Sequence, residues 1–259
     1  MKKNKFLLAE PLIAGKETIA LTKKVLAANF PNEGKFARLF EKKISKLLKV
    51  KYVVTVTSGT ISIFLALKAL GIEKDDEVIV PNITFPATAN AIKLAGAKPV
   101  LVDVDKNNLL INEKILKKKI TKKTKAIIPV HISGRGLNIK KIIKVAKNNN
   151  LYVIEDAAEA FMSKNGNRYL GTFGDVGCFS FAPNKIITTG QGGIAVTNNK
   201  LIYKNLLRLK DQGRTGPTTD GEDNYISVGY NFKYTDLQAA LGLAQLKRLK
   251  ERIHILRNH

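Results

Sequence analysis

The sequence predicts an α/β fold in which a mostly parallel sheet is covered by helices on both faces. Segments with helical spacing alternate with short apolar runs between residues 35 and 160. The apolar runs are continuous, which is typical of parallel strands buried on both faces. The 259 residues, 44% of them hydrophobic and 25% charged, are enough for a sizeable core. We therefore expect one large domain over residues 1–259.

The alternation can be followed in order along the chain. The first helix is predicted over 35–48, with apolar side chains at helical spacing: Phe36, Leu39, Phe40, Ile44, Leu47 and Leu48. The strand YVVTVTSG follows and ends at Gly59. The next predicted elements are a helix at 61–72, a strand at 77–82, a helix at 87–97, a strand at 98–105, a strand at 126–134, a helix at 139–150 and a strand at 151–156.

The pattern changes after Gly171. GDVGCFSFAPNKIITTGQGGIAVTNN predicts two strands joined by a loop, and residues 203–211 are expected to be helical. The segment 214–232 is polar and glycine-bearing, which predicts a loop. Thr235 then caps a final amphipathic helix over about 235–257.

Charge is the unusual feature of the composition. Lys and Arg number 44 against 21 Asp and Glu, a net charge of +23, which attracts polyanions. The basic residues are scattered except for seven lysines between positions 114 and 125, and no aromatic residue lies among them. A single-strand binder stacks bases on such aromatics, so we expect no nucleic-acid partner, although nucleic-acid binding stays an alternative.

Two further observations concern compartment and metals. The N-terminal MKKNKFLLAEPLIAG begins like a signal peptide, but Glu10 and Pro11 interrupt its apolar stretch. No run is long enough to insert into a membrane. A lone Cys178 forms neither an internal disulfide nor a zinc cluster. We expect an uncleaved cytoplasmic protein without a metal site.

Four places could carry chemistry. Ser58, Gly59 and Thr60 stand at a strand-to-helix junction, where N–H groups and hydroxyls bind anions, although most such junctions are only caps. Asp156 ends a strand at the carboxyl edge, where open α/β sheets bind ligands, and it could equally cap a helix formed by AAEA. Glu155 is expected to point to the opposite side of the strand.

The other two places lie after the sheet. Lys185 follows an apolar strand that ends at Ser180, and burial there would lower its pKa and make the amine nucleophilic. A solvent-facing lysine is the alternative in so basic a chain. Tyr230 and Asn231 lie in the GYNF segment, which could also be an apolar anchor for the final helix.

Together these segments resemble the DegT/DnrJ/EryC1/StrS family of pyridoxal-phosphate sugar aminotransferases, which have the aspartate-aminotransferase fold (fold type I). The matching stretches cover nearly the whole chain in the family's order: SGTISIFLALKALGI, DEVIVPNITFPATANAIKLAGAKPVLVDVD, TKAIIPVHISG, VIEDAAEA, LGTFGDVGCFSF, NKIITTGQGGIAVT and GYNFKYTDLQAALGLAQL. The string NKIITTGQGG most resembles the perosamine-synthase-like branch.

The resemblance implies a role for each candidate. Lys185 would form a Schiff base with pyridoxal 5'-phosphate and then shuttle a proton, while Asp156 would pair with the pyridine nitrogen. Gly59, Thr60 and Ser180, with Ser58 beside them, would hold the phosphate. Phe85 would stack on the ring, and Glu159, one helical turn after Asp156, could face the same pocket.

The resemblance also implies partners. The site would lie between two subunits of a homodimer, with Asn231 reaching the phosphate of the neighbouring subunit. The substrate would be a nucleotide-linked 4-keto-6-deoxyhexose, the amino donor L-glutamate, and the pathway lipopolysaccharide or other polysaccharide biosynthesis. A basic surface would help to capture the diphosphate. A dehydrating branch has histidine in place of the lysine, so Lys185 favours transamination.

The chain is shorter than is usual in the family. Family members continue past the final helix into a small C-terminal domain, whereas this sequence ends at His259. We therefore expect the small domain to be absent. The alternative function is a truncated, catalytically weak or inactive remnant that still binds the cofactor.

Overall fold

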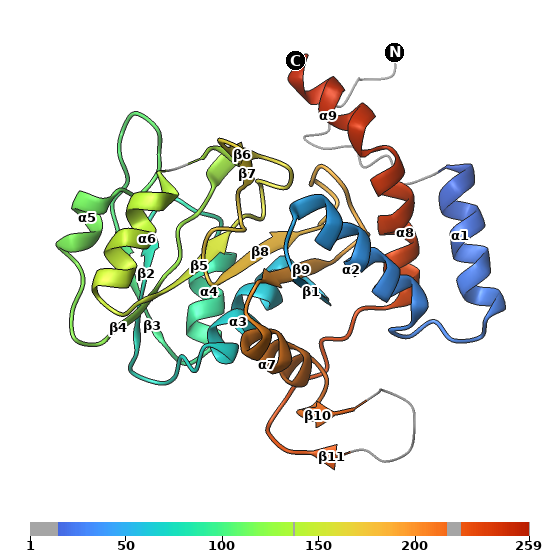
Figure 1. Ribbon diagram of the computed structural model, residues 1–259, viewed down its shortest axis with the longest axis horizontal. Helices are drawn as coiled ribbons and strands as arrows, with labels where there is room; N and C mark the ends of the chain where they lie inside the picture. The colour runs from blue at the N-terminus through green and yellow to red at the C-terminus, as the bar shows by residue number, and fades with distance from the viewer. Residues whose placement is uncertain (1–14, 137, 217–223, 259) are drawn as a thin grey trace, which may run out of the picture.

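The computed structural model describes residues 15–136, 138–216 and 224–258. The expectations for the N-terminal segment and for part of the 214–232 loop lie outside these residues. A seven-stranded sheet forms the centre (Figure 1), in the order β1-β9-β8-β5-β4-β2-β3. Its strands are β1 (Tyr52–Val56), β2 (Glu77–Pro81), β3 (Lys98–Val102), β4 (Thr124–Ile127), β5 (Tyr152–Asp156), β8 (Val176–Ser180) and β9 (Gly193–Thr197).

The predicted parallel sheet is confirmed, with one strand reversed. Strand β9 is antiparallel to both of its neighbours, β1 and β8. The β8–β5, β5–β4, β4–β2 and β2–β3 pairs are parallel. Because β9 is the only reversed strand, β1, β8, β5, β4 and β2 present their carboxyl ends at one edge of the sheet, where a ligand site is expected.

Helices cover both faces of the sheet because alternate strand residues point to opposite sides. Val54 and Val56 face one apolar cluster, while Val53, directly before Val54, faces another. The helices of the first face are α3 (Gly59–Ala69), α4 (Ala87–Leu94) and α7 (Lys200–Lys210). Those of the second face are α2 (Lys35–Leu48), α5 (Glu113–Lys117), α6 (Ile139–Asn148) and α8 (Asp236–Lys247).

The remaining elements lie around this core. Helix α1 (Lys16–Ala27), which the apolar pattern did not predict, packs against α8. Two short hairpins are also additional: β6 (Lys164–Asn165) with β7 (Arg168–Tyr169), and β10 (Arg214–Thr215) with β11 (Asn224–Tyr225). Figure 1 shows β10 and β11 projecting away from the sheet.

Three sequence predictions about helices need correction. Leu39 was placed on the buried face of α2, yet 44% of it is exposed. The predicted helix after Asp156 is absent, since residues 158 and 159 form a turn. The final helix starts at the Thr235 cap as predicted, but it divides at Arg248 into α8 and α9 (Leu249–Arg257). This break lets Ile253 of α9 pack on the second-face cluster.

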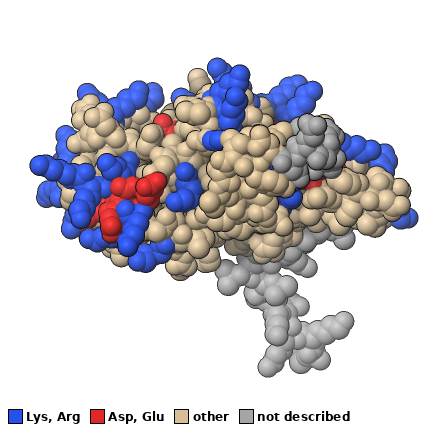
Figure 2. Space-filling model, turned by 90° about the horizontal axis from the view of Figure 1, so that it is seen from below, with Lys and Arg blue, Asp and Glu red and all other residues tan. Residues whose placement is uncertain are grey.

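The surface is strongly basic over a wide area. Figure 2 shows Lys and Arg side chains at both ends of the molecule, whereas Asp and Glu occupy a few small areas. All seven lysines between positions 114 and 125 are exposed. No helix within the described ranges is both long and apolar enough to cross a bilayer. A cytoplasmic location stays a prediction.

Asp236 joins the start of α8 to the start of α2. Its buried carboxylate accepts hydrogen bonds from the N–H groups of Gly34 (2.9 Å), Phe36 (3.2 Å) and Ala37 (2.8 Å). A helix leaves these first N–H groups without internal acceptors, and Gly34 leaves room for the carboxylate. The residue therefore caps a helix 200 positions away in the chain.

We expect Asp236→Ala to lower the free energy of unfolding by roughly 3 kcal/mol, because three helix-terminal donors lose their acceptor. Chemical denaturation would measure the loss. Glu73→Ala, at an exposed position, is the control and should leave stability nearly unchanged. Equal stability of both variants would contradict the capping role.

Candidate active site at the carboxyl edge of the sheet

Three strand ends bring the predicted residues together. Gly193 of β9 pairs with Val56 of β1 on one side and with Ser180 of β8 on the other. Strand β5 then lies beside β8 and ends at Asp156. The turn after β1, the end of β8 and the end of β5 therefore meet at one edge.

The start of α3 and Ser180 form a polar cradle. Ser58 caps α3 by accepting the N–H of Ile61 at 3.2 Å. The N–H groups of Gly59 and Thr60 belong to the first turn, which has no intrahelical acceptors for them. A Cβ at Gly59 would lie only 2.8 Å from Cβ of Ser180, so glycine is required for this close approach. The cradle offers N–H and hydroxyl donors suited to a phosphate.

Asp156 is buried with two protein donors on its carboxylate. Oδ1 accepts the N–H of Ala158 at 3.1 Å, and Oδ2 accepts the hydroxyl of Thr88 at 2.7 Å. Burial raises the pKa of Asp156, while these hydrogen bonds and the charges of His131 and Lys185 lower it in part. The interpretation of Asp156 as a helix cap is wrong, because its partner lies in a turn.

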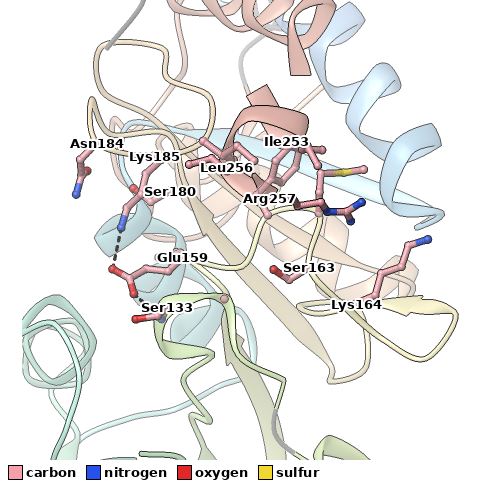
Figure 3. Close-up of a pocket in the computed structure, with 15 residues that line it drawn as sticks. Ser133, Glu159, Ser163, Lys164, Ser180, Asn184, Lys185, Ile253, Leu256 and Arg257 are labelled. Atoms are coloured by element: carbon pink, nitrogen blue, oxygen red, sulfur yellow. Dashed lines mark hydrogen bonds and ion pairs between the residues drawn. The ribbon is translucent and has the colours of Figure 1, made fainter. Parts of the chain in front are cut away.

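Lys185 and Glu159 meet in a cavity of about 760 Å³. Nζ of Lys185 lies 3.4 Å from Oε1 of Glu159, and the lysine side chain is 17% exposed. The other oxygen of Glu159 accepts the N–H of Ser133 at 2.8 Å. Figure 3 shows Lys185 and Glu159 pointing toward one another across this cavity, with Ser133 beside the carboxylate. The solvent-facing interpretation of Lys185 is therefore wrong.

Of the predicted site residues, Glu159, Ser180 and Lys185 line this cavity, whereas Phe85 and Asn231 do not. Phe85 precedes α4 and is 76% exposed, so its ring is free to pack on a ligand. Asn231 is exposed too, and its backbone forms a bridge with Asp211 on the segment after α7. Asn231 does not line the cavity that holds Lys185.

Glu155 points away from this edge, as expected. Its buried carboxylate accepts hydrogen bonds from Nε2 of His131 at 2.8 Å and from the N–H groups of Gly171, Phe173 and Gly174. Glu155 therefore holds the loop before β8 in place and has a structural role. Cys178 is fully buried, and burial raises the pKa of its thiol well above the ordinary range, so the thiol stays protonated.

Sequence reasoning missed two residues that contact the predicted ones. Thr88 binds the carboxylate of Asp156, and Ser133 binds Glu159. Thr84 and Thr88 follow β2 at the carboxyl edge of the sheet, Thr84 before α4 and Thr88 in its first turn, so their position after a strand end was the available signal. For Ser133 the sequence carries no comparable signal.

A lysine amine, a buried carboxylate and a phosphate cradle at one sheet edge are the features that the family resemblance implies. The model of the DegT/DnrJ/EryC1/StrS aminotransferase family matches residues 13–258. The chain belongs to this family. The family resemblance and its fold are thereby confirmed.

Relatives and solved structures agree with this membership. GDP-perosamine synthase of Escherichia coli O157:H7 is 43% identical over 92% of this chain and 65% of its own length. PseC of Helicobacter pylori, an aminotransferase of pseudoaminic acid biosynthesis, superimposes with a TM-score of 0.88 at 32% identity, over 95% of this chain and 66% of its own. An E. coli GDP-4-keto-6-deoxy-D-mannose-3-dehydratase with bound hydrated PLP superimposes with a TM-score of 0.86 at 29% identity, over 95% of this chain and 68% of its own.

This chain thus spans about two thirds of the length of the relatives that it matches. The matched part contains the sheet edge with Lys185, Asp156 and Ser180, which is the portion relevant to a cofactor.

The edge fits pyridoxal phosphate on its own geometry. The cradle of Gly59, Thr60 and Ser180 suits the phosphate. The buried Asp156 has no cation within hydrogen-bond distance among the described residues, so it suits a protonated ring nitrogen. The charge of Lys185 lowers the pKa of Asp156 in part, against the larger effect of burial.

Proposed function

We propose that the chain is a pyridoxal-phosphate-dependent aminotransferase that transfers the amino group of L-glutamate to a nucleotide-linked keto sugar, a 4-keto-6-deoxyhexose. The observation that carries the proposal is the Lys185 amine in the cavity together with the buried carboxylate of Asp156 at the end of β5. The name of the E. coli relative, GDP-perosamine synthase, supports an amino sugar as the product. The two substrates exchange an amino group for a carbonyl oxygen, so glutamate leaves as 2-oxoglutarate.

Each residue has a task in this proposal. When bound, pyridoxal phosphate supplies an aldehyde that takes up the amino group and a ring that accepts the substrate carbon's electron pair. Lys185 moves a proton to or from that carbon through Nζ, and Glu159 orients this amine. Asp156 holds a proton at the ring nitrogen. Gly59, Thr60 and Ser180 bind the phosphate, and Phe85 packs on the ring.

A homodimer with shared sites is part of the proposal. Tyr225, Ile226 and Val228 precede Asn231 and are more than half exposed. Exposed apolar side chains of this kind are typical of an interface. Asn231 does not line its own chain's cavity, which supports the proposed role of this residue at the phosphate of the partner subunit.

The alternative, a cofactor-binding remnant without turnover, is not favoured, because Lys185, the candidate for proton transfer, is present and lies 3.4 Å from Glu159. Nothing in the described structure favours a nucleic-acid partner over a nucleotide sugar.

We expect the purified chain to acquire a visible absorption band with pyridoxal phosphate. We expect it to form more than one equivalent of 2-oxoglutarate per site from glutamate only when a nucleotide-4-keto sugar is present as amino acceptor. Absorbance titration and a coupled 2-oxoglutarate assay measure the two steps. A chain that shows no band in excess cofactor would refute the enzyme proposal. A band without turnover would favour the remnant.

A further inference from the structure

Two threonine hydroxyls lie behind the carboxylate of Asp156. Oγ1 of Thr88 is 2.7 Å from Oδ2 of Asp156 and 2.8 Å from Oγ1 of Thr84. Thr88 is fully buried in the first turn of α4, and Asp156 ends β5. The contact joins residues 68 positions apart in the chain, so only the fold creates it.

Proton counting fixes the direction of both hydrogen bonds. An ionised Asp156 has no proton to give, and Oγ1 of Thr88 lies closer to Oδ2 (2.7 Å) than to the carbonyl oxygen of Phe85 (3.2 Å), so the single hydroxyl proton of Thr88 is donated to Oδ2. The hydroxyl of Thr84 then donates to Oγ1 of Thr88, which has only acceptor capacity left. The result is a directed chain of two donors that ends on the carboxylate, and each bond polarises the next.

This chain acts on a carboxylate that burial makes difficult to ionise. Burial is the largest influence on Asp156 and raises its pKa, whereas the Thr88 hydrogen bond is the largest influence that lowers it. A hydrogen bond to a charged group is stronger than one between neutral groups, and the Thr88–Asp156 bond has the short length typical of this class.

The same residue also fixes the turn that carries Phe85. The N–H of Thr88 donates to the carbonyl oxygen of Phe85 at 3.2 Å. Thr88 therefore contacts both the buried carboxylate of Asp156 and the backbone that carries the exposed ring of Phe85.

We propose that Thr88 is a positioning residue that holds Asp156 ionised and oriented toward the ring nitrogen of the cofactor, with Thr84 as a second donor behind it. The inference rests on the proposed function, because it gives Asp156 a protonated pyridine as its partner. Thr88 acts through Asp156 and does not itself need to touch the cofactor.

The test compares two cofactors on the full chain. Pyridoxal phosphate has the ring nitrogen, whereas its 1-deaza analogue keeps the aldehyde and the phosphate but has carbon at that position. We expect Thr88→Val to weaken pyridoxal phosphate binding by about tenfold, since a bond to a charged group is lost. The same variant should bind the analogue nearly as well as the wild type does.

Two further variants serve as controls. Thr88→Ser keeps the hydroxyl and should restore pyridoxal phosphate affinity to within about twofold of the wild type. Thr84→Val keeps the direct bond to Asp156 and should weaken binding by only about threefold, again for pyridoxal phosphate alone. Thermal melting of each chain without cofactor shows whether the variant is folded. If Thr88→Val is not folded, the comparison of the two cofactors on Thr84→Val provides the test.

The outcomes separate this inference from the proposed function. Equal losses for both cofactors, or no loss in a folded Thr88→Val chain, would overturn the role of Thr88 while the proposed function stands. Failure of the wild type to bind pyridoxal phosphate at all would overturn the proposed function itself. A loss confined to the cofactor with the ring nitrogen, rescued by serine, supports the inference.

Discussion

Lys185→Ala is expected to abolish the visible band that the chain acquires with pyridoxal phosphate and to reduce the amination rate about a thousandfold or more. The reason is that Lys185 supplies both the amine that bonds to the aldehyde and the group that moves the proton. Its amine is held at 3.4 Å from Glu159 in the cavity and is mostly buried. Absorbance spectra and initial rates measure the two effects.

A matched control is available on the same chain. Lys144 is an exposed lysine on α6, remote in the fold from the carboxyl edge, so Lys144→Ala removes the same side chain without touching the site. It should keep the band and the rate. Retention of the band in Lys185→Ala would show that another amine bonds to the aldehyde, and the assignment of Lys185 would be wrong.

Asp156→Asn is expected to weaken pyridoxal phosphate binding by about ten- to a hundredfold, because the ring nitrogen loses its anionic partner. The amide still fits the space, because its carbonyl oxygen can accept the N–H of Ala158 while its NH2 group can donate to Oγ1 of Thr88. The loss therefore reports the charge and not the shape of the side chain. Absorbance titration of both chains measures it.

The same substitution has the opposite effect on the stability of the chain without cofactor. Because the pKa of Asp156 is raised on folding, ionised Asp156 destabilises the folded chain at neutral pH. The stability that the protonated Asp156 contributes is fully present below the pKa that this residue has in the unfolded chain. It is lost as pH rises through the pKa of Asp156 in the folded chain. Asp156→Asn should thus melt at a higher temperature than the wild type at pH 7, and the difference should shrink as pH falls through the raised pKa.

Thermal melting without cofactor across this pH range measures the effect. A lower melting temperature for Asp156→Asn at pH 7 would mean that the carboxylate stabilises the empty site. In that case Asp156 would be a structural residue and not one kept for a ligand. The two readouts together distinguish a residue selected for binding from one selected for stability.

Much of the fold could be predicted because its signals are local. Helix α2 has the predicted bounds, and β2 ends at Pro81 as expected. The apolar pattern of α2 and the continuous apolar run of β2 follow directly from helical and strand periods. The helix predicted after Asp156 failed because a carboxylate that accepts an N–H two residues ahead stabilises a turn as well as a cap.

The candidate site was predicted in part for the same reason. Ser58, Asp156, Ser180 and Lys185 each stand near a strand end, and parallel strands bring such ends together. The specific contacts that those residues make were not predictable in this way. Glu159 meets Lys185 across 26 positions, and Thr88 meets Asp156 across 68.

The sequence by itself determined the alternation of helices and strands, the residues that end each strand, and the lysine and carboxylate available for chemistry. Only the tertiary structure decided that β9 runs against its neighbours, that Asp236 caps α2, and that Thr88 donates to Asp156. The physical reason is range: periodicity and turn chemistry act over a few residues, whereas these contacts join segments that packing alone brings within hydrogen-bond distance.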